Sequence, residues 1–134
     1  MTTPLVETDG DGQQRSWWRQ IKEELIHPFV ELEAEYYDLG REKRRATGDR
    51  IVSEAAEAEQ YYGVAVKCEA ATAEGLILAW ADALGKRARL DGQRELETFA
   101  GGLSEACRRA MEEGFVRGSE LIGKVQENLK KTLG

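Results

Sequence analysis

Apolar residues recur every three or four positions along most of this chain, and no proline follows Pro28 to interrupt them. Proline breaks helices because it lacks an N–H group and because its ring clashes with the preceding turn. The first apolar stripe begins after Ser16, a favourable N-cap residue. It consists of Trp18, Ile21, Leu25, Phe29, Leu32, Tyr36 and Leu39. This spacing predicts an amphipathic helix over residues 16–45 that bends where Pro28 removes a hydrogen bond.

Turn signals divide the remaining residues into two further helices. Gly48 and Asp49 can end one helix and cap the next. Gly85 can end the second helix, and the segment from Leu90 to Gly92 gives a turn and a new cap. These signals predict helices over residues 50–86 and 93–132. The alternation of apolar and polar residues that is typical of strands is not evident.

The fold class expected from these patterns is all-α, with three long helices in a coiled-coil-like bundle. The second and third helices are expected to form an antiparallel helical hairpin, with the first helix packed along it. Residues 1–15 are polar and are predicted to form a flexible N-terminal tail. Residues 16–134 would then form a single helical-bundle domain.

Small residues are spaced four apart on the last two predicted helices. A glycine inside a helix costs about 1 kcal/mol relative to alanine, so repeated glycines on one stripe suggest close contact between backbones. A run of this kind can also arise by chance in alanine-rich helices. The predicted helix–helix seam consists of Ala71, Gly75, Gly102, Ala106, Ala110, Gly114 and Gly118. The same register would place Cys68 beside Cys107, either as two buried thiols or as a redox-sensitive pair.

Charge and cysteine content limit the expected partners and location. The net charge of −6 makes binding to nucleic acid unlikely, because phosphate is repelled on average. Two cysteines in 134 residues fit a reducing compartment, and the first twelve residues lack the basic and apolar regions of a signal peptide. The longest apolar run is too short to span a membrane. These observations predict a cytoplasmic protein with no membrane span.

No motif for catalysis or for cofactor binding is recognisable, so the sequence predicts a protein that is not an enzyme and has no cofactor. Long helices need a neighbour along their length, which favours association with further copies of this chain or with another protein. The expected function is that of a non-enzymatic assembly or adaptor protein. Its partner-binding anchors would be aromatic residues, because these dominate interface hot spots: Trp17, Trp18, Tyr37 and Tyr61.

Two alternatives remain open at this stage. Glu24 and His27 have the Glu-x-x-His spacing of ferritin-like metal-binding bundles, and Glu31 lies one turn further on. The second alternative is a helical subunit of a nucleoprotein complex. It would bind phosphate through a basic cluster of Arg41, Lys43, Arg44, Arg45 and Arg50.

Overall fold

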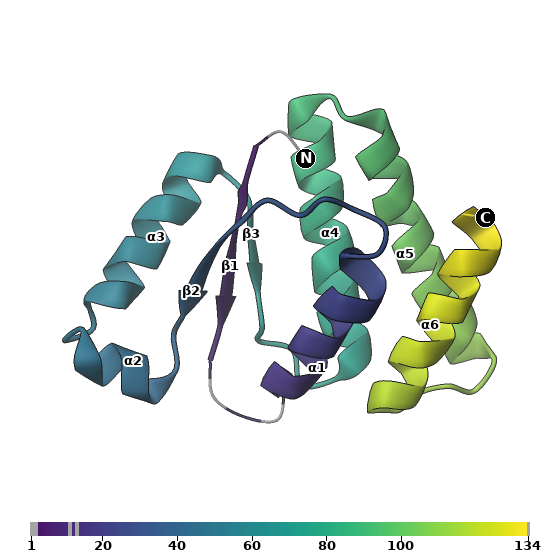
Figure 1. The fold of residues 1–134 in the computed structure, drawn as a ribbon, viewed down its shortest axis with the longest axis horizontal. Helices are drawn as coiled ribbons and strands as arrows, with labels where there is room; N and C mark the ends of the chain where they lie inside the picture. The colour runs from purple at the N-terminus through teal and green to yellow at the C-terminus, as the bar shows by residue number, and fades with distance from the viewer. Residues whose placement is uncertain (1–2, 11, 13, 134) are drawn as a thin grey trace.

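Three short parallel strands form the centre of the fold (Figure 1). The computed structural model describes residues 3–10, 12 and 14–133. The central strand β1 (Leu5–Asp9) pairs on one side with β2 (Ala34–Asp38) and on the other with β3 (Ala65–Lys67), so the sheet order is β2-β1-β3. Parallel strands require long crossover connections, and these are helical. The connections are α1 (Gln14–Ile21) and the π-helix η1 (Lys22–Ile26) between β1 and β2, then α2 (Arg41–Ala46) and α3 (Arg50–Tyr62) between β2 and β3.

Helices cover both faces of this sheet. Helix α3 contacts β1 and β2 on one face, and α4 (Ala73–Asp91) contacts β3 on the other face, where it also packs against α1 (Figure 1). The outer layer beyond α4 is made by α5 (Arg94–Glu112) and α6 (Gly118–Leu133). None of the helices in the described residues is long and apolar enough to cross a membrane.

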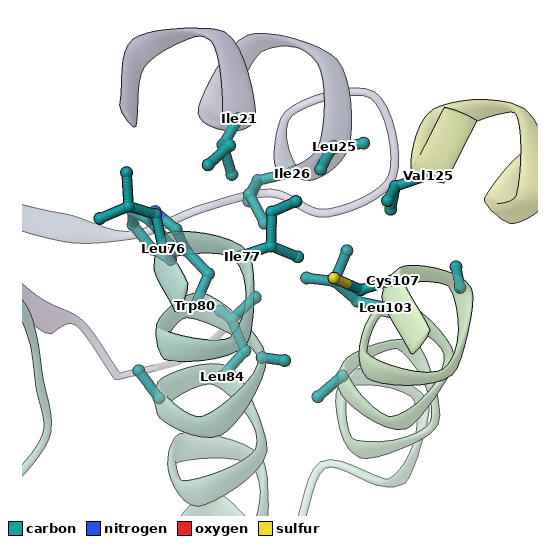
Figure 2. Packing of buried hydrophobic residues seen from close by; sticks show 14 of the residues in the cluster. Ile21, Leu25, Ile26, Leu76, Ile77, Trp80, Leu84, Leu103, Cys107 and Val125 are labelled. Atoms are coloured by element: carbon teal, nitrogen blue, oxygen red, sulfur yellow. The ribbon is translucent and has the colours of Figure 1, made fainter. Parts of the chain in front are cut away.

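The main core lies between the sheet, α1, α4 and the two outer helices. Trp18 of α1 and Trp80 of α4 are fully buried, with their ring centroids 5.0 Å apart. Figure 2 shows the aliphatic side chains that converge from η1, α4, α5 and α6 on the same space. They include Leu25, Ile26, Leu76, Ile77, Leu84, Leu103 and Val125. Burial of these residues is the principal force that holds the helices to the sheet.

The expectation of an all-α fold is therefore correct only in its high helix content. The predicted continuous helix over 16–45 is wrong, because α1 and η1 end at Ile26, β2 follows from Ala34 and a separate helix, α2, begins at Arg41. Pro28 lies in the turn that separates them, so it terminates the helix rather than bending it. Leu32, Tyr36 and Leu39 continued the three-and-four spacing by coincidence.

The other two predicted helices are each interrupted. Residues 50–86 contain α3, the strand β3 and most of α4, and Gly85 lies inside α4 instead of ending it. Residues 93–132 contain α5 and α6, separated by a turn in which Gly114 has a φ of 96°. The helical hairpin itself is confirmed, since α4 and α5 pack together across a turn at Gly92 (Figure 1).

The predicted flexible tail contains the centre of the sheet. All five residues of β1 are buried, including the polar residues Glu7, Thr8 and Asp9. Acidic residues near a chain end resemble a solvated segment when they are read without their partners. Here their burial is compensated because side chains from α1, η1 and β2 form ion pairs or hydrogen bonds with them.

Candidate ligand-binding site at the carboxyl edge of the sheet

The carboxyl ends of β1 and β2 bring two aspartates together. Asp9 and Asp38 are the last residues of these strands and are aligned in the parallel register. In open parallel sheets with helices on both faces, ligands bind outside the carboxyl ends of the strands, near the point where the strand order reverses. In the order β2-β1-β3 the reversal lies between β1 and β3, so Asp9 is next to it and Asp38 is one strand away.

Arg15 joins the two aspartates. Its Nη2 atom lies 3.0 Å from Asp9 Oδ1 and 2.6 Å from Asp38 Oδ1, and its Nε donates to the Gly10 carbonyl oxygen at 2.8 Å. The Tyr36 hydroxyl donates to Asp9 Oδ1 at 2.7 Å. Asp9 is almost completely buried, so these two donors compensate the loss of its hydration. The resulting arrangement fixes the orientation of the Arg15 guanidinium.

Glu7 is a second buried carboxylate and lies two residues before Asp9 on the same strand. Glu7 accepts a hydrogen bond from Trp18 Nε1 at 2.7 Å and pairs with Lys22 Nζ at 2.9 Å. Lys22 also lies over the Tyr36 ring, 5.3 Å from its centroid. This cation–π contact links the Glu7 cluster to the Asp9 cluster. Helix α1 therefore supplies the indole N–H group, and η1 the cation, that stabilise the buried Glu7.

Neither the phenol nor the nearby thiol ionises at neutral pH. Burial, followed by the hydrogen bond to Asp9 and the charge of that carboxylate, raises the pKa of Tyr36 well above its ordinary value. Burial and the charge of Asp9 raise the pKa of the Cys68 thiol to about 11. Tyr36 is therefore a hydrogen-bond donor, and Cys68 is not poised to act as a nucleophile.

A shallow hollow beside α1 exposes the remaining part of this arginine. Its lining is mixed in charge and consists of Gly12, Arg15, Ser16, Arg19, Gln20 and Glu23. Within the described residues, Arg15 Nη1 has no hydrogen-bond partner and the exposed Arg19 makes no ion pair. Guanidinium groups bind carboxylates through paired N–H donors. The hollow can thus accept a small ligand that carries carboxylates.

Asp38 couples this edge to pH. Burial opposes its ionisation, but the Gly40 amide and the Arg15 guanidinium together lower the pKa of Asp38 below its ordinary value of 3.8. A lowered pKa in the folded state adds stability above the unfolded-state pKa, and this stability is lost as the pH falls through the folded-state pKa.

We expect Asp38→Asn to make the urea midpoint less sensitive to a pH decrease from about 4 to about 2. Glu42→Gln, at an exposed position of α2, is the control, and equal pH sensitivity in both variants would contradict this role.

The predicted partner-binding aromatics are placed differently from one another. Trp18 is fully buried in the core, where it is unavailable to a partner. Trp17 is half-buried, and its ring lies 2.9 Å from the point that a Cβ atom would occupy at Gly118. Gly118 has a φ of 26°, so both the backbone and the indole ring favour glycine there. Tyr37 is half-buried in β2 and Tyr61 is 79% exposed, and a partner role for these two stays a prediction.

The predicted small-residue seam is not brought together in one contact. Ala71 precedes α4, and Gly75 lies in its first turn against Ala70 and Thr72. Ala106 and Ala110 are buried in α5, whereas Gly102 has no atom within 4 Å of an added Cβ, and Gly114 and Gly118 lie beyond the end of α5. The close approach in the hairpin is instead between Gly85 and Ala100, where an added Cβ would lie 3.6 Å from the alanine Cβ.

The residues proposed for the metal alternative lie in η1 and in the segment that follows it. Glu24 lies in η1, and His27 and Glu31 are exposed in the segment that follows. No group of three histidine, cysteine or acidic residues that could hold a metal ion occurs among the described residues. Both cysteines, Cys68 and Cys107, are free thiols.

The predicted basic cluster does lie at one end of the fold. Arg41, Lys43, Arg44 and Arg45 belong to the exposed helix α2, and Arg50 begins α3 and lies 3.7 Å from Glu54. Nucleic-acid binding by this cluster is not tested by its placement alone, because an exposed basic helix is also a common solvated surface.

Fold and site together define a small parallel α/β unit with buried and half-buried polar side chains clustered at the carboxyl edge of its sheet. Its most similar curated relatives include the cytosolic isocitrate dehydrogenase [NADP] of Arabidopsis thaliana, which is 49% identical over 72 residues, 54% of this chain and 18% of that protein. The isocitrate dehydrogenase [NADP] of Nicotiana tabacum is 51% identical over 69 residues, 52% of this chain and 17% of its own length. The mitochondrial enzyme of Saccharomyces cerevisiae is 48% identical over 69 residues, 52% and 16% of the two chains. No protein-family model matches the chain.

These similarities contradict the predicted non-enzymatic adaptor function, because the relatives are named isocitrate dehydrogenases, which are enzymes. Metal binding through Glu24 and His27 and nucleic-acid binding by the basic cluster stay predictions. The match spans about a sixth of the length of these relatives. Their names include cytosolic, mitochondrial and chloroplastic forms, so the cytoplasmic location of this chain stays a prediction.

The sequence patterns did not predict this site, because its residues lie in segments that were predicted to be a tail or a helix. Glu7 and Asp9 fell in the supposed tail, and Asp38 fell within the supposed first helix. The available signal was the pair of apolar residues Leu5 and Val6 directly before the acidic residues, which fits a short buried strand ending in a polar loop.

Proposed function

We propose that this chain takes part in the NADP-dependent dehydrogenation of isocitrate. The observation that carries the proposal is the identity of about half of the aligned residues to enzymes of that name. The chemistry of the carboxyl edge supports it, because isocitrate is a small hydroxy acid with three carboxylates. The Nη1 group of Arg15 and the guanidinium of Arg19 would donate hydrogen bonds to one of these carboxylates.

The side chains around the hollow would orient the substrate. Arg15 is held by Asp9 and Asp38, so its free N–H groups are preorganised before the ligand binds. Tyr36 remains protonated and keeps Asp9 hydrogen-bonded. The proposed contribution of these residues is therefore the binding and positioning of a carboxylate.

The turn after β1 does not fit the phosphates of NADP. Phosphates bind where a turn offers free N–H groups or unpaired cations. Asp9 places a carboxylate at this turn, and two carboxylates already occupy Arg15 Nη2. The N-terminus of α4 does not offer a phosphate site either, because the Gly75 amide already donates to Thr72 Oγ1 and Ala70 packs against Gly75. The residues of these two turns therefore do not fit the phosphates of NADP.

Isothermal titration of the full chain with isocitrate tests the proposal, together with absorbance at 340 nm after addition of NADP⁺. We expect isocitrate to bind, and Arg19→Ala to weaken the binding by about fivefold, equivalent to roughly 1 kcal/mol. Arg94→Ala is the matched control, because this exposed arginine lies at the start of α5, on the opposite end of the fold (Figure 1). Absence of both isocitrate binding and NADPH formation would rule the proposed function out.

A further inference from the structure

The outer edge of β3 carries unused backbone hydrogen-bonding groups. The Val6 amide donates to the Val64 carbonyl and the Cys68 amide donates to the Thr8 carbonyl, so the even-numbered residues of this segment point their backbone groups toward β1. Ala65 and Lys67 consequently direct theirs away from the sheet. The Lys67 carbonyl already accepts a hydrogen bond from the Glu69 amide. Within the described residues, the Ala65 N–H, the Ala65 carbonyl and the Lys67 N–H have no partner.

This edge forms the floor of a groove. One wall is α4, which contributes the small side chains of Ala79 and Ala83, and Glu59 of α3 lies at the other side. Val64 and Val66 point into the core under α4, whereas Ala65 is half-buried and Lys67 is exposed and paired with Glu59 at 3.5 Å. The small residues on α4 leave room for the side chains of an additional strand.

Two unpaired charges mark the α4 wall. Asp82 and Lys86 both line the groove, are exposed and form no ion pair with any described residue. Four helical residues span about 6 Å along the axis, and two residues of a strand span about 6.6 Å. Alternate side chains of a strand laid beside β3 would therefore meet these two charges in turn.

We propose that the groove binds an extended segment of another polypeptide, which joins the sheet as a fourth, parallel strand beside β3. Its middle residue lies opposite Ala65. The Ala65 N–H donates to the carbonyl of the residue before the middle one, and the Ala65 carbonyl accepts from the N–H of the residue after it, as in a parallel ladder formed by strand addition. The residue before the middle one is acidic and faces Lys86, and the residue after the middle one is basic and faces Asp82. This order follows from the chain direction, since α4 begins near the carboxyl end of β3 and runs back along it (Figure 1).

The strands of a second copy of this chain do not meet this requirement. β1 has the sequence LVETD and β2 has AEYYD, so neither contains a basic residue, and β3 (AVK) contains no acidic residue. Charge complementarity therefore selects a different polypeptide, which carries an acidic and a basic residue two positions apart.

Fluorescence anisotropy with two labelled peptides tests the charge pattern. Each probe has eight residues, mainly valine and threonine; in one probe a glutamate precedes a lysine by two positions, and in the other their order is reversed. We expect the full chain to bind the glutamate-first peptide at least about fivefold more tightly. The double variant Asp82→Lys/Lys86→Glu should reverse this preference, while Arg89→Glu, at an exposed position of the same helix, should leave it unchanged. Failure to bind either peptide, or a preference that the double variant does not reverse, would overturn the proposal.

The backbone contribution is tested at Ala65. Ala65→Pro removes an N–H group that β1 does not use, so the ladder between β1 and β3 is kept. This substitution should weaken binding of the glutamate-first peptide at least about tenfold, because a hydrogen bond is lost and the proline ring obstructs the added strand. In the unmodified chain, bound peptide should slow hydrogen exchange at the Ala65 and Lys67 amides and leave Val66 and Cys68 as they were. Unchanged exchange at Ala65 and Lys67 with bound peptide would place the peptide elsewhere and refute the proposal.

Discussion

Trp18→Ala is expected to lower the free energy of unfolding by about 3–5 kcal/mol, which is much of the stability of a domain of this size. The indole is fully buried and packs against Trp80, so truncation leaves a large cavity between α1 and α4. It also removes the N–H group that donates to Glu7 at 2.7 Å inside the core. The measurement is the urea unfolding midpoint and slope, followed by far-ultraviolet circular dichroism.

Trp17→Ala provides a matched comparison because the same side chain is truncated one residue earlier. Trp17 is only half-buried, and its indole makes none of the side-chain hydrogen bonds observed in the described residues. The expected loss is about 1–2 kcal/mol, mainly from reduced apolar burial. Equal losses for the two variants would show that the contact with Trp80 and Glu7 has no special weight in the stability of the fold.

The helical hairpin could be predicted because its signals are local. Apolar spacing on α4 and α5 and the turn at Gly92 depend on residues close together in sequence. Gly92 adopts a left-handed φ of 65°, which suits the turn expected there. The break at Gly48 was also visible, since Gly48 and Asp49 both have left-handed backbones directly before α3.

The sheet could not be predicted because its stability comes from contacts between distant segments. β1 contains two acidic residues among five buried positions, and its burial depends on Arg15, Lys22 and Tyr36. β3 has only three residues, which is too short to show a two-residue period. Tertiary contacts therefore decided the conformation of segments whose local pattern was weak or misleading.

The candidate site follows from the same contacts. The residue types were visible, but no spacing in the sequence joins Asp9, Arg15 and Asp38, which meet only because β1 and β2 are parallel neighbours. A parallel pair needs a crossover helix, and α1 is that helix as well as the source of Arg15. The crossover that makes the sheet possible thus also supplies the cation that allows two carboxylates to share one edge.

Arg87→Ala is expected to destabilise the fold by about 3–5 kcal/mol, since removing one partner of a buried ion pair leaves the other uncompensated. Arg87 is 5% exposed and lies 3.0 Å from Asp91. It also donates to the Tyr62 carbonyl at 2.5 Å and to the Pro4 carbonyl at 3.3 Å. One side chain of α4 therefore joins the end of α3 to the segment that enters β1.

Arg89→Ala is the control for this prediction, because Arg89 lies two residues further along the same helix and is exposed. Its expected effect is within about 0.5 kcal/mol. The double variant Arg87→Met/Asp91→Leu should recover part of the lost stability, since it removes both charges and keeps the apolar volume. Urea unfolding of the four proteins distinguishes a buried ion pair from simple packing. If the double variant is less stable than Arg87→Ala, the uncompensated charge of Asp91 is not the cause of the loss.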